Sequence, residues 1–249
     1  MKKDRDNIVR TMRDQWNDRA ETNPCYYVNS VRRDWDITEY FESGARDVAR
    51  LLSLSSSSME REIRRMVLLE IGCGNGRMTR ELARRFEHVY ALDISERMVE
   101  QGKGLLADIK NVTFVVGNGV DLGGISDRQC DFCFSYTVFQ HMPTKEVVFD
   151  YLEEIYRVLK PGGIARIQFN GYWKTLIERY PKKYLVQFLG TIGIKRESYR
   201  FKGYFDTWVG VYISKGSMRR KMQSLGFQDL IIQDFGGTDV WVEARRPRN

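Results

Sequence analysis

Ten consecutive residues, Val67 to Gly76, constrain the fold of this chain more than any other segment. They read VLLEIGCGNG: an apolar, strand-like run carries the acid Glu70 near its end, and glycines then alternate at 72, 74 and 76. Residues 77–86 follow with apolar side chains at helical spacing. A strand, a glycine turn and a helix in this order bring a nucleotide-like ligand against backbone N–H groups at a helix N-terminus.

The rest of the chain continues this alternation of strands and helices. We expect strands at 67–71, 88–92, 112–116, 130–136 and 163–169, and helices at 77–86, 95–107 and 143–159. A last helix at 214–225 precedes two strand-like runs, 227–235 and 239–245, which a short glycine turn joins into an antiparallel hairpin. The pattern predicts an α/β fold with a doubly wound, mainly parallel, seven-stranded sheet whose last strand is antiparallel.

The spacing of the three glycines argues against a dinucleotide as the ligand. A dinucleotide fingerprint needs a glycine at position 77, where this chain has Arg77. Gly-x-Gly-x-Gly after an acid resembles motif I of the class I (Rossmann-like) S-adenosylmethionine-dependent methyltransferases. Further motifs stand in that family's order over about residues 60–170: Asp93, Asn118, the strand end at 135–136 and Leu159-Lys160-Pro161-Gly162-Gly163. The resemblance, to the small-molecule type of the family, implies S-adenosylmethionine as cofactor and S-adenosylhomocysteine as product.

Asp93 stands 17 residues after Gly76 at a predicted strand end, where a carboxylate suits ribose hydroxyls. The alternative is an acid at a helix N-terminus, because Ser95 is a typical N-cap. By the resemblance, Ile94 and Met98 would pack on the adenine, although they also fit an ordinary apolar helical turn. Asn118 would accept from the adenine amino group, or would serve a turn with Gly119. The predicted cofactor-binding residues are Glu70, Gly72, Cys73, Gly74, Gly76, Asp93, Ile94, Met98, Asn118, Gly119, Val120, Ser135 and Tyr136.

His141 is one of only two histidines and follows the strand at 130–136. It is the candidate catalytic residue, a general base for an O or N nucleophile of a small organic molecule. The alternative is a structural histidine that caps the helix starting near Pro143. Aromatic residues of the N-terminal segment, Trp16 and Trp35 among them, would form another wall of the site. The predicted substrate residues are Tyr26, Tyr27, Phe139, Tyr172, Trp173, Tyr204 and Trp208.

The positive charge of the chain is concentrated in one segment. Residues 160–221 hold fourteen Lys or Arg and three acids, whereas the whole chain has a net charge of +7. Aromatic residues are interleaved with these charges. We predict a helical cap over 1–58 and a cofactor-binding domain over 59–249, in which 171–212 form an insertion that covers a small, aromatic or anionic substrate. The alternative partner is RNA, bound through phosphate contacts and base stacking. A cofactor-binding protein without catalytic activity is a further alternative.

The four cysteines do not form a disulfide framework. Cys130 and Cys133 lie three apart on a predicted strand, so we expect them to face opposite sides of the sheet and to share no metal. The sequence has no secretory signal at its start and no stretch of about 20 apolar residues. We therefore expect a cytoplasmic protein that has no metal site and no membrane association.

Overall fold

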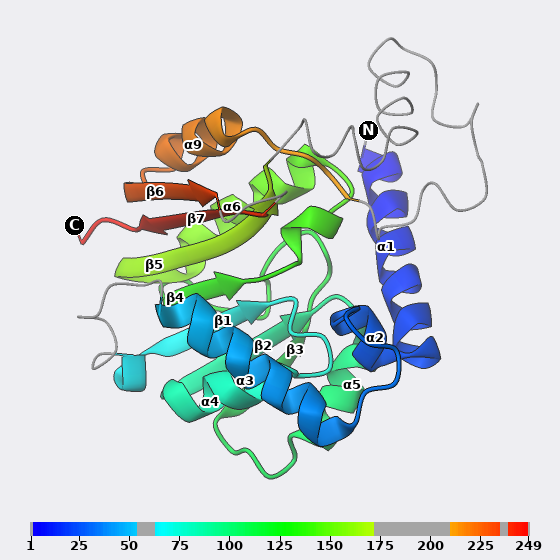
Figure 1. The fold of residues 1–249 in the computed structure, drawn as a ribbon. Coiled ribbons are helices and arrows are strands. Elements are labelled where there is room, and N and C mark those ends of the chain that lie inside the picture. Colours follow the sequence, from blue (N-terminus) through cyan, green and yellow to red (C-terminus); the bar gives the residue numbers. More distant parts are fainter. Residues whose placement is uncertain (1, 54–62, 172–209, 235–238, 249) are drawn as a thin grey trace.

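The computed structural model describes residues 2–53, 63–171, 210–234 and 239–248 of the chain. Its strands are β1 Val67–Ile71, β2 His88–Asp93, β3 Val112–Val116, β4 Cys130–Ser135, β5 Leu159–Asn170, β6 Gln228–Asp234 and β7 Asp239–Arg245. They form one sheet in the order β3-β2-β1-β4-β5-β7-β6 (Figure 1). Strands β1 to β5 pair in parallel, and β7 runs antiparallel to β5 and β6. The predicted topology, including the terminal hairpin, is confirmed.

Helices cover both faces of this sheet. They are α1 Lys2–Thr22, α2 Pro24–Val28, α3 Ile37–Ser53, α4 Thr79–Arg85, α5 Glu96–Leu105, α6 Lys145–Val158 and α9 Lys215–Ser224, with short 3-10 helices η1 Ile63–Arg65 and η2 Phe139–His141. Successive residues of a strand point to opposite faces. Accordingly, Leu68 packs into an apolar cluster with α3 and α4, whereas Leu69 packs into a second cluster with α6 and α9. Strands buried on both sides explain the unbroken apolar runs in the sequence.

The N-terminal helix α1 lies across the end of the sheet toward which the arrows of β4 and β6 point (Figure 1). It docks on α5 through polar contacts. Asn17 Oδ1 accepts a hydrogen bond of 2.7 Å from the Ser95 hydroxyl, and Gln101 Nε2 donates to the Ala20 carbonyl at 3.0 Å. The predicted division into a cap over 1–58 and a domain over 59–249 stays a prediction. Of the predicted insertion, only 171 and 210–212 lie within the described residues.

The turn expected at Lys160–Gly163 is found inside β5, not before it. Cys130 pairs with Leu159, but Phe132 pairs with Ile164, so the register between β4 and β5 shifts here. Gly162 has a φ of +83° and donates its N–H to the Arg246 carbonyl at 2.9 Å. The glycine-containing segment is therefore an irregularity of the ladder, with the strand continuing on both sides.

The cysteine prediction was partly wrong. Cys130 and Cys133 belong to the same apolar cluster, and Cys130 opens β4 beside the place where its register with β5 shifts. Both are buried free thiols. Among the described side chains, no group of three or more His, Cys, Asp or Glu residues is arranged to hold a metal ion. No helix in the described ranges has the length and hydropathy to span a membrane.

Helix α3 approaches the start of α4 so closely that Gly44 has no room for a side chain. A Cβ atom there would stand 2.1 Å from the Arg77 carbonyl oxygen, a backbone atom. Gly104 in α5 is the opposite case, since its Cβ would meet nothing within 4 Å. The two glycines therefore separate the effect of packing from the effect of helix propensity.

We predict that Gly44→Ala lowers the free energy of unfolding by about 1–3 kcal/mol, because α3 must move away from the glycine turn. Gly104→Ala, the control, should raise it by up to about 1 kcal/mol through helix propensity alone. Urea denaturation of both variants measures the two changes. Stabilisation of equal size by both substitutions would contradict the close packing of α3.

Candidate functional site

The glycine turn after β1 forms a cradle of bare backbone. Gly72, Gly74 and Gly76 have φ values of +77°, +54° and +92°, in the left-handed region that favours glycine. A Cβ on Gly72 would stand 2.0 Å from Val138 Cγ2. The N–H groups of Gly72 and Cys73 both donate to the Leu92 carbonyl, at 2.7 and 3.0 Å, which fixes the turn to the end of β2. The turn thus fits the nucleotide-like ligand that the sequence predicted.

Asp93, the last residue of β2, is bonded to this turn. Its Oδ2 accepts from the Gly74 N–H at 2.8 Å and its Oδ1 from the Ser95 N–H at 2.9 Å. Burial raises the pKa of Asp93, while hydrogen bonds from the backbone N–H groups of Ser95, Gly74 and Ile94 oppose the rise. A carboxylate offers about four acceptor positions, so these backbone donors do not use all of its capacity. The alternative of an acid at a helix N-terminus is confirmed, because Ser95 is the N-cap of α5. The ribose-binding role of Asp93 stays a prediction.

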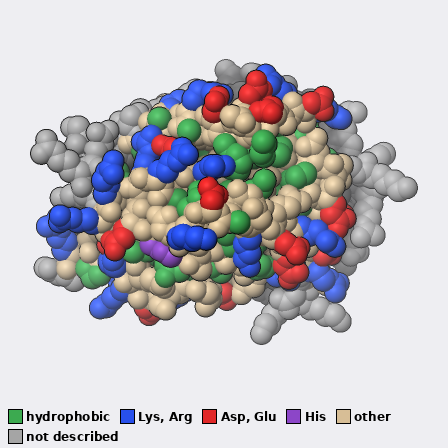
Figure 2. Space-filling view, turned by 90° about the horizontal axis from the view of Figure 1, so that it is seen from below, with side chains coloured by type: hydrophobic (Ala, Val, Ile, Leu, Met, Phe, Trp, Pro, Cys, Tyr) green, Lys and Arg blue, Asp and Glu red, His purple; other side chains and the backbone are tan. Residues whose placement is uncertain are grey.

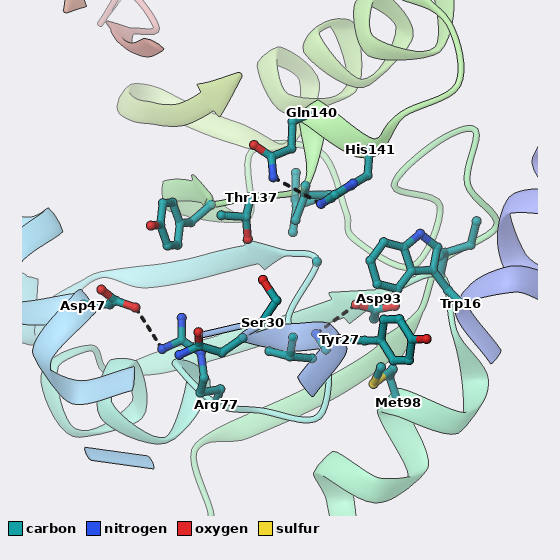
Figure 3. Close-up of a pocket in the computed structure, with 18 of the residues that line it drawn as sticks. Trp16, Tyr27, Ser30, Asp47, Arg77, Asp93, Met98, Thr137, Gln140 and His141 are labelled. Carbon is teal, nitrogen blue, oxygen red and sulfur yellow. Dashed lines mark hydrogen bonds and ion pairs between the residues drawn. The ribbon is translucent and has the colours of Figure 1, made fainter. Parts of the chain in front are cut away.

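A cavity of about 680 Å³ opens beside the turn, in the size range of small-molecule sites. Its walls come from α1, α2, α3, the ends of β1 and β2, and the segment after β4 (Figure 3). The predicted site residues that line it are Tyr27, Gly72, Gly74, Asp93, Ile94, Met98, Tyr136 and His141. Trp16 and Trp35 also line it, as expected of the N-terminal segment.

Other predicted site residues do not line this cavity: Glu70, Cys73, Gly76, Asn118, Gly119, Val120, Ser135, Tyr26 and Phe139. Asn118 Oδ1 accepts from the backbone N–H groups of Val120 and Asp121, at 2.8 and 2.9 Å, so the turn interpretation describes it. The Ser135 hydroxyl donates to the Ile71 carbonyl at 3.1 Å. The predicted substrate residues Tyr172, Trp173, Tyr204 and Trp208 lie outside the described residues.

Glu70 lies behind the turn. It is 4% exposed, and its Oε2 accepts a hydrogen bond of 2.6 Å from the hydroxyl of Thr79, the first residue of α4. Burial raises the pKa of Glu70 to about 7, while the Thr79 hydrogen bond and the charge of Arg77 oppose the rise. Glu70 therefore joins β1 to α4 and does not face the main cavity.

His141 lies on η2 and faces the cavity. Its ring contacts Trp16 of α1 edge-on, with 5.4 Å between ring centroids. The proposed capping role is wrong: Thr144 is the N-cap of α6, and its side chain accepts from the Val147 N–H. The His141 ring therefore lies in the wall of the cavity, against Trp16, and does not cap α6.

A series of amide hydrogen bonds indicates which ring nitrogen of His141 accepts a hydrogen bond. The backbone N–H of Thr137 donates to Gln168 Oε1 at 2.9 Å, so the Gln168 amide nitrogen points to Gln140 Oε1, at 3.2 Å. The Gln140 amide nitrogen in turn lies 3.2 Å from His141 Nε2 (Figure 3). Because a backbone N–H can only donate, this series makes His141 Nε2 an acceptor. Thr137 has a φ of +58°, which is unusual for a β-branched residue.

Sequence reasoning missed one corner of the cavity, formed by Ser43, Asp47 and Arg77. Arg77 Nη1 donates to Asp47 Oδ2 at 2.8 Å and to Ser43 Oγ at 3.1 Å. The available signal was the polar spacing Ser43, Asp47 and Arg50 along α3, a helix with buried Tyr40, Val48 and Leu51. The spacing of these three polar residues does not indicate which part of the molecule they contact.

In the described part of the basic segment 160–221, most Lys and Arg side chains are paired with acidic side chains. Of its six described Lys and Arg residues, four form ion pairs: Lys160 with Asp131, Arg166 with Glu243, Lys215 with Asp234 and Lys221 with Glu153. Figure 2 shows basic and acidic side chains interspersed over the face that it presents. A field of one sign, which nucleic-acid binding requires, is not supported by these described residues.

The chain is similar to known methyltransferases. Residues 69–167 match the family described as "Methyltransferase domain". Over 140 residues the chain is 30% identical to phosphoethanolamine N-methyltransferase 1 of Triticum aestivum, covering 50% of this chain and 28% of that protein. Over 187 residues it is 23% identical to a ubiquinone biosynthesis O-methyltransferase of Roseobacter denitrificans, covering 73% and 65%. The chain spans 27–39% of the length of the first three curated relatives.

Among solved structures, the chain is similar to magnesium protoporphyrin IX methyltransferase from Synechocystis PCC 6803 with bound S-adenosylhomocysteine. The TM-score is 0.62 at 18% identity, and the match covers 94% of this chain and 97% of that one. At this identity the likeness concerns the fold.

The buried Glu70 predicts a pH effect on stability. Its folded pKa of about 7 lies above the ordinary value of 4.5, so between these values the folded state holds a proton that the unfolded state has released. Stability is therefore lost as the pH rises through this window, by up to about 1.4 kcal/mol per pH unit. Denaturation of wild type and Glu70→Gln at pH 5 and pH 7.5 measures this loss.

Glu70→Gln keeps an acceptor for Thr79 but cannot titrate, so its stability should fall less than that of the wild type over the same interval. Glu42→Gln is the control, because the Glu42 side chain is 60% exposed on α3. Parallel pH profiles for wild type and Glu70→Gln would refute the raised pKa.

Proposed function

We propose that this chain, whose residues 69–167 match the methyltransferase domain family, is a class I S-adenosylmethionine-dependent methyltransferase that transfers a methyl group to an O or N nucleophile of a small organic molecule. The observation that carries this proposal is the glycine cradle with the buried Asp93 carboxylate bonded to it beside a large cavity. The two curated relatives are named for an N- and an O-methylation, which supports both kinds of nucleophile.

The residues of the turn fit this cofactor. Asp93 would hold the ribose hydroxyls with its remaining acceptor positions, and Ile94 and Met98 would pack on the adenine. When bound, S-adenosylmethionine supplies a methyl group that its sulfonium already activates. The work of the chain is then to orient the acceptor and to exclude water, which can account for much of the lowering of the barrier.

The acceptor would lie beside the wall of the cavity formed by Thr137, Val138, Gln140 and His141. There, His141 Nε2 accepts a hydrogen bond from the Gln140 amide. A hydroxyl or amine that displaces the Gln140 amide would find a basic nitrogen at the same place. His141 is therefore our candidate for the general base.

Cofactor binding tests the central claim. Wild-type protein should bind S-adenosylhomocysteine in calorimetry, and Asp93→Ala should weaken that binding by about 1.5–3 kcal/mol, the value of hydrogen bonds to a charged group. Asp108→Ala is the control, because Asp108 pairs with Arg80 at 3.7 Å and does not line the cavity. No binding by the wild type at millimolar ligand would end the proposal, whereas equal affinities of wild type and Asp93→Ala would remove only Asp93.

The chain's two histidines provide a matched test of the base. With a panel of phenol, hydroxy acid and amine acceptors, His141→Asn should lower kcat about 10²- to 10⁴-fold and leave S-adenosylhomocysteine affinity unchanged. His88→Asn should keep wild-type activity, because His88 bonds to Thr113 and does not line the cavity. Equal rates for His141→Asn and wild type would exclude His141 as the base. Cofactor binding without turnover on any acceptor would instead favour the non-catalytic alternative.

A further inference from the structure

Arg77 is a buried cation in the wall of the cavity whose hydrogen-bonding capacity is only partly used. It follows the glycine turn directly and is 4% exposed. Its two hydrogen bonds, to Asp47 and Ser43, both come from Nη1. Nε is buried and has no hydrogen-bond partner within the described part of the chain. Buried donors in native proteins almost always have partners, so an incomplete one at a cavity indicates a ligand.

The chemistry of this corner selects the ligand. A guanidinium has five donors in a planar fork that matches a carboxylate, and Arg77 uses one nitrogen for its internal partners. Asp47 does not belong to Arg77 alone, because its Oδ1 also accepts from Arg50 at 3.2 Å. The shared carboxylate leaves Arg77 able to bind a further anionic group, and burial strengthens such a bond.

The position of Arg77 indicates which carboxylate it meets. Figure 3 shows Asp93 and Met98 at one end of the cavity and Arg77 with Asp47 at the other. Gly72 and Gly74 line the cavity too, and the turn that contains them leads to Arg77. With the adenosine held at Asp93 and Met98, the amino-acid end of the cofactor must extend away from them, and the bare backbone of the turn offers the route.

We propose that Arg77 binds the carboxylate of the methionine end of S-adenosylmethionine and so makes the site selective for ligands with this group. The proposal rests on the proposed function, since it takes the same cofactor in the same cavity. The Ser43 and Asp47 contacts then have a positioning role: they hold the guanidinium against α3 with its remaining donors available. A small acceptor with its own carboxylate is the competing source of the same chemistry.

Two ligands separate these sources, because they differ only in the amino-acid tail. S-adenosylhomocysteine has the tail, whereas 5′-methylthioadenosine keeps the adenosine and the thioether without it. Calorimetry should show that Arg77→Gln weakens S-adenosylhomocysteine about 10- to 100-fold while the Kd of 5′-methylthioadenosine stays within twofold. Arg80→Gln is the matched control: it removes a positive charge three residues further along the chain, in α4, at a residue that does not line the cavity.

A second variant distinguishes ligand binding from a purely structural role. Asp47→Asn removes the internal ion pair but keeps the guanidinium, so it should retain the preference for S-adenosylhomocysteine over 5′-methylthioadenosine. Arg77→Lys keeps a charge without the fork and should lose part of the preference; it carries the test if Arg77→Gln does not fold. Thermal unfolding of each variant verifies its folding.

Three results would overturn the assignment. Equal weakening of both ligands by Arg77→Gln would make Arg77 structural, and no weakening of either would leave it without a role in binding. An unchanged preference together with a raised KM for the acceptor would assign the carboxylate to the acceptor. In each case wild-type binding of S-adenosylhomocysteine survives and with it the proposed function. Failure of wild type to bind either ligand would instead contradict the proposed function itself.

Discussion

The hydrogen bond from the Gly74 N–H to the Asp93 carboxylate is the contact on which the site depends. It ties the glycine turn to the end of β2, and the same carboxylate accepts from Ser95 at the start of α5. One buried acid thus aligns a strand end, a turn and a helix start. The turn can follow this path because its three glycines adopt φ values that other residues rarely reach. Asp93 lines the cavity and retains acceptor capacity toward it, because the backbone donors do not use all the acceptor positions of a carboxylate.

The N-terminal helices turn this cradle into an enclosed cavity. Tyr40 of α3 donates to Asn75 in the turn at 2.5 Å, and Asp47 pairs with Arg77 directly after it. Helix α1 brings Trp16 against His141. Each helix therefore contacts a different part of the site. Polar groups at these contacts are buried in pairs, and a shift of one helix would leave partners unsatisfied. For the same reason, a methyl group added at Gly44 would displace α3 and disturb its contacts with the turn.

The elements of the fold were predictable because they depend on short-range pattern. The bounds of β1 and β3 were predicted to the residue, since apolar runs between glycine or asparagine turns allow little choice. The direction of a side chain was less predictable. Asn118 and Asp93 both follow strands, yet Asn118 is used by its own turn while Asp93 faces the cavity. The difference arises from local hydrogen bonds and from the packing of α1, neither of which the spacing of residues records.

The sequence by itself determined the seven-stranded topology, the glycine turn and the acid after the second strand, because each follows from backbone conformation or from periodic burial. Tertiary structure decided which residues share the cavity. It brought Ser43 and Asp47 to Arg77, Trp16 to His141 and Thr137 to Gln168, contacts that join residues 30 to 125 positions apart. Such contacts depend on how helices cross the ends of the strands, and no local pattern specifies that. The glycine turn and Asp93 could therefore be predicted from the sequence, whereas the walls of the cavity around Arg77 and His141 depend on the folded molecule.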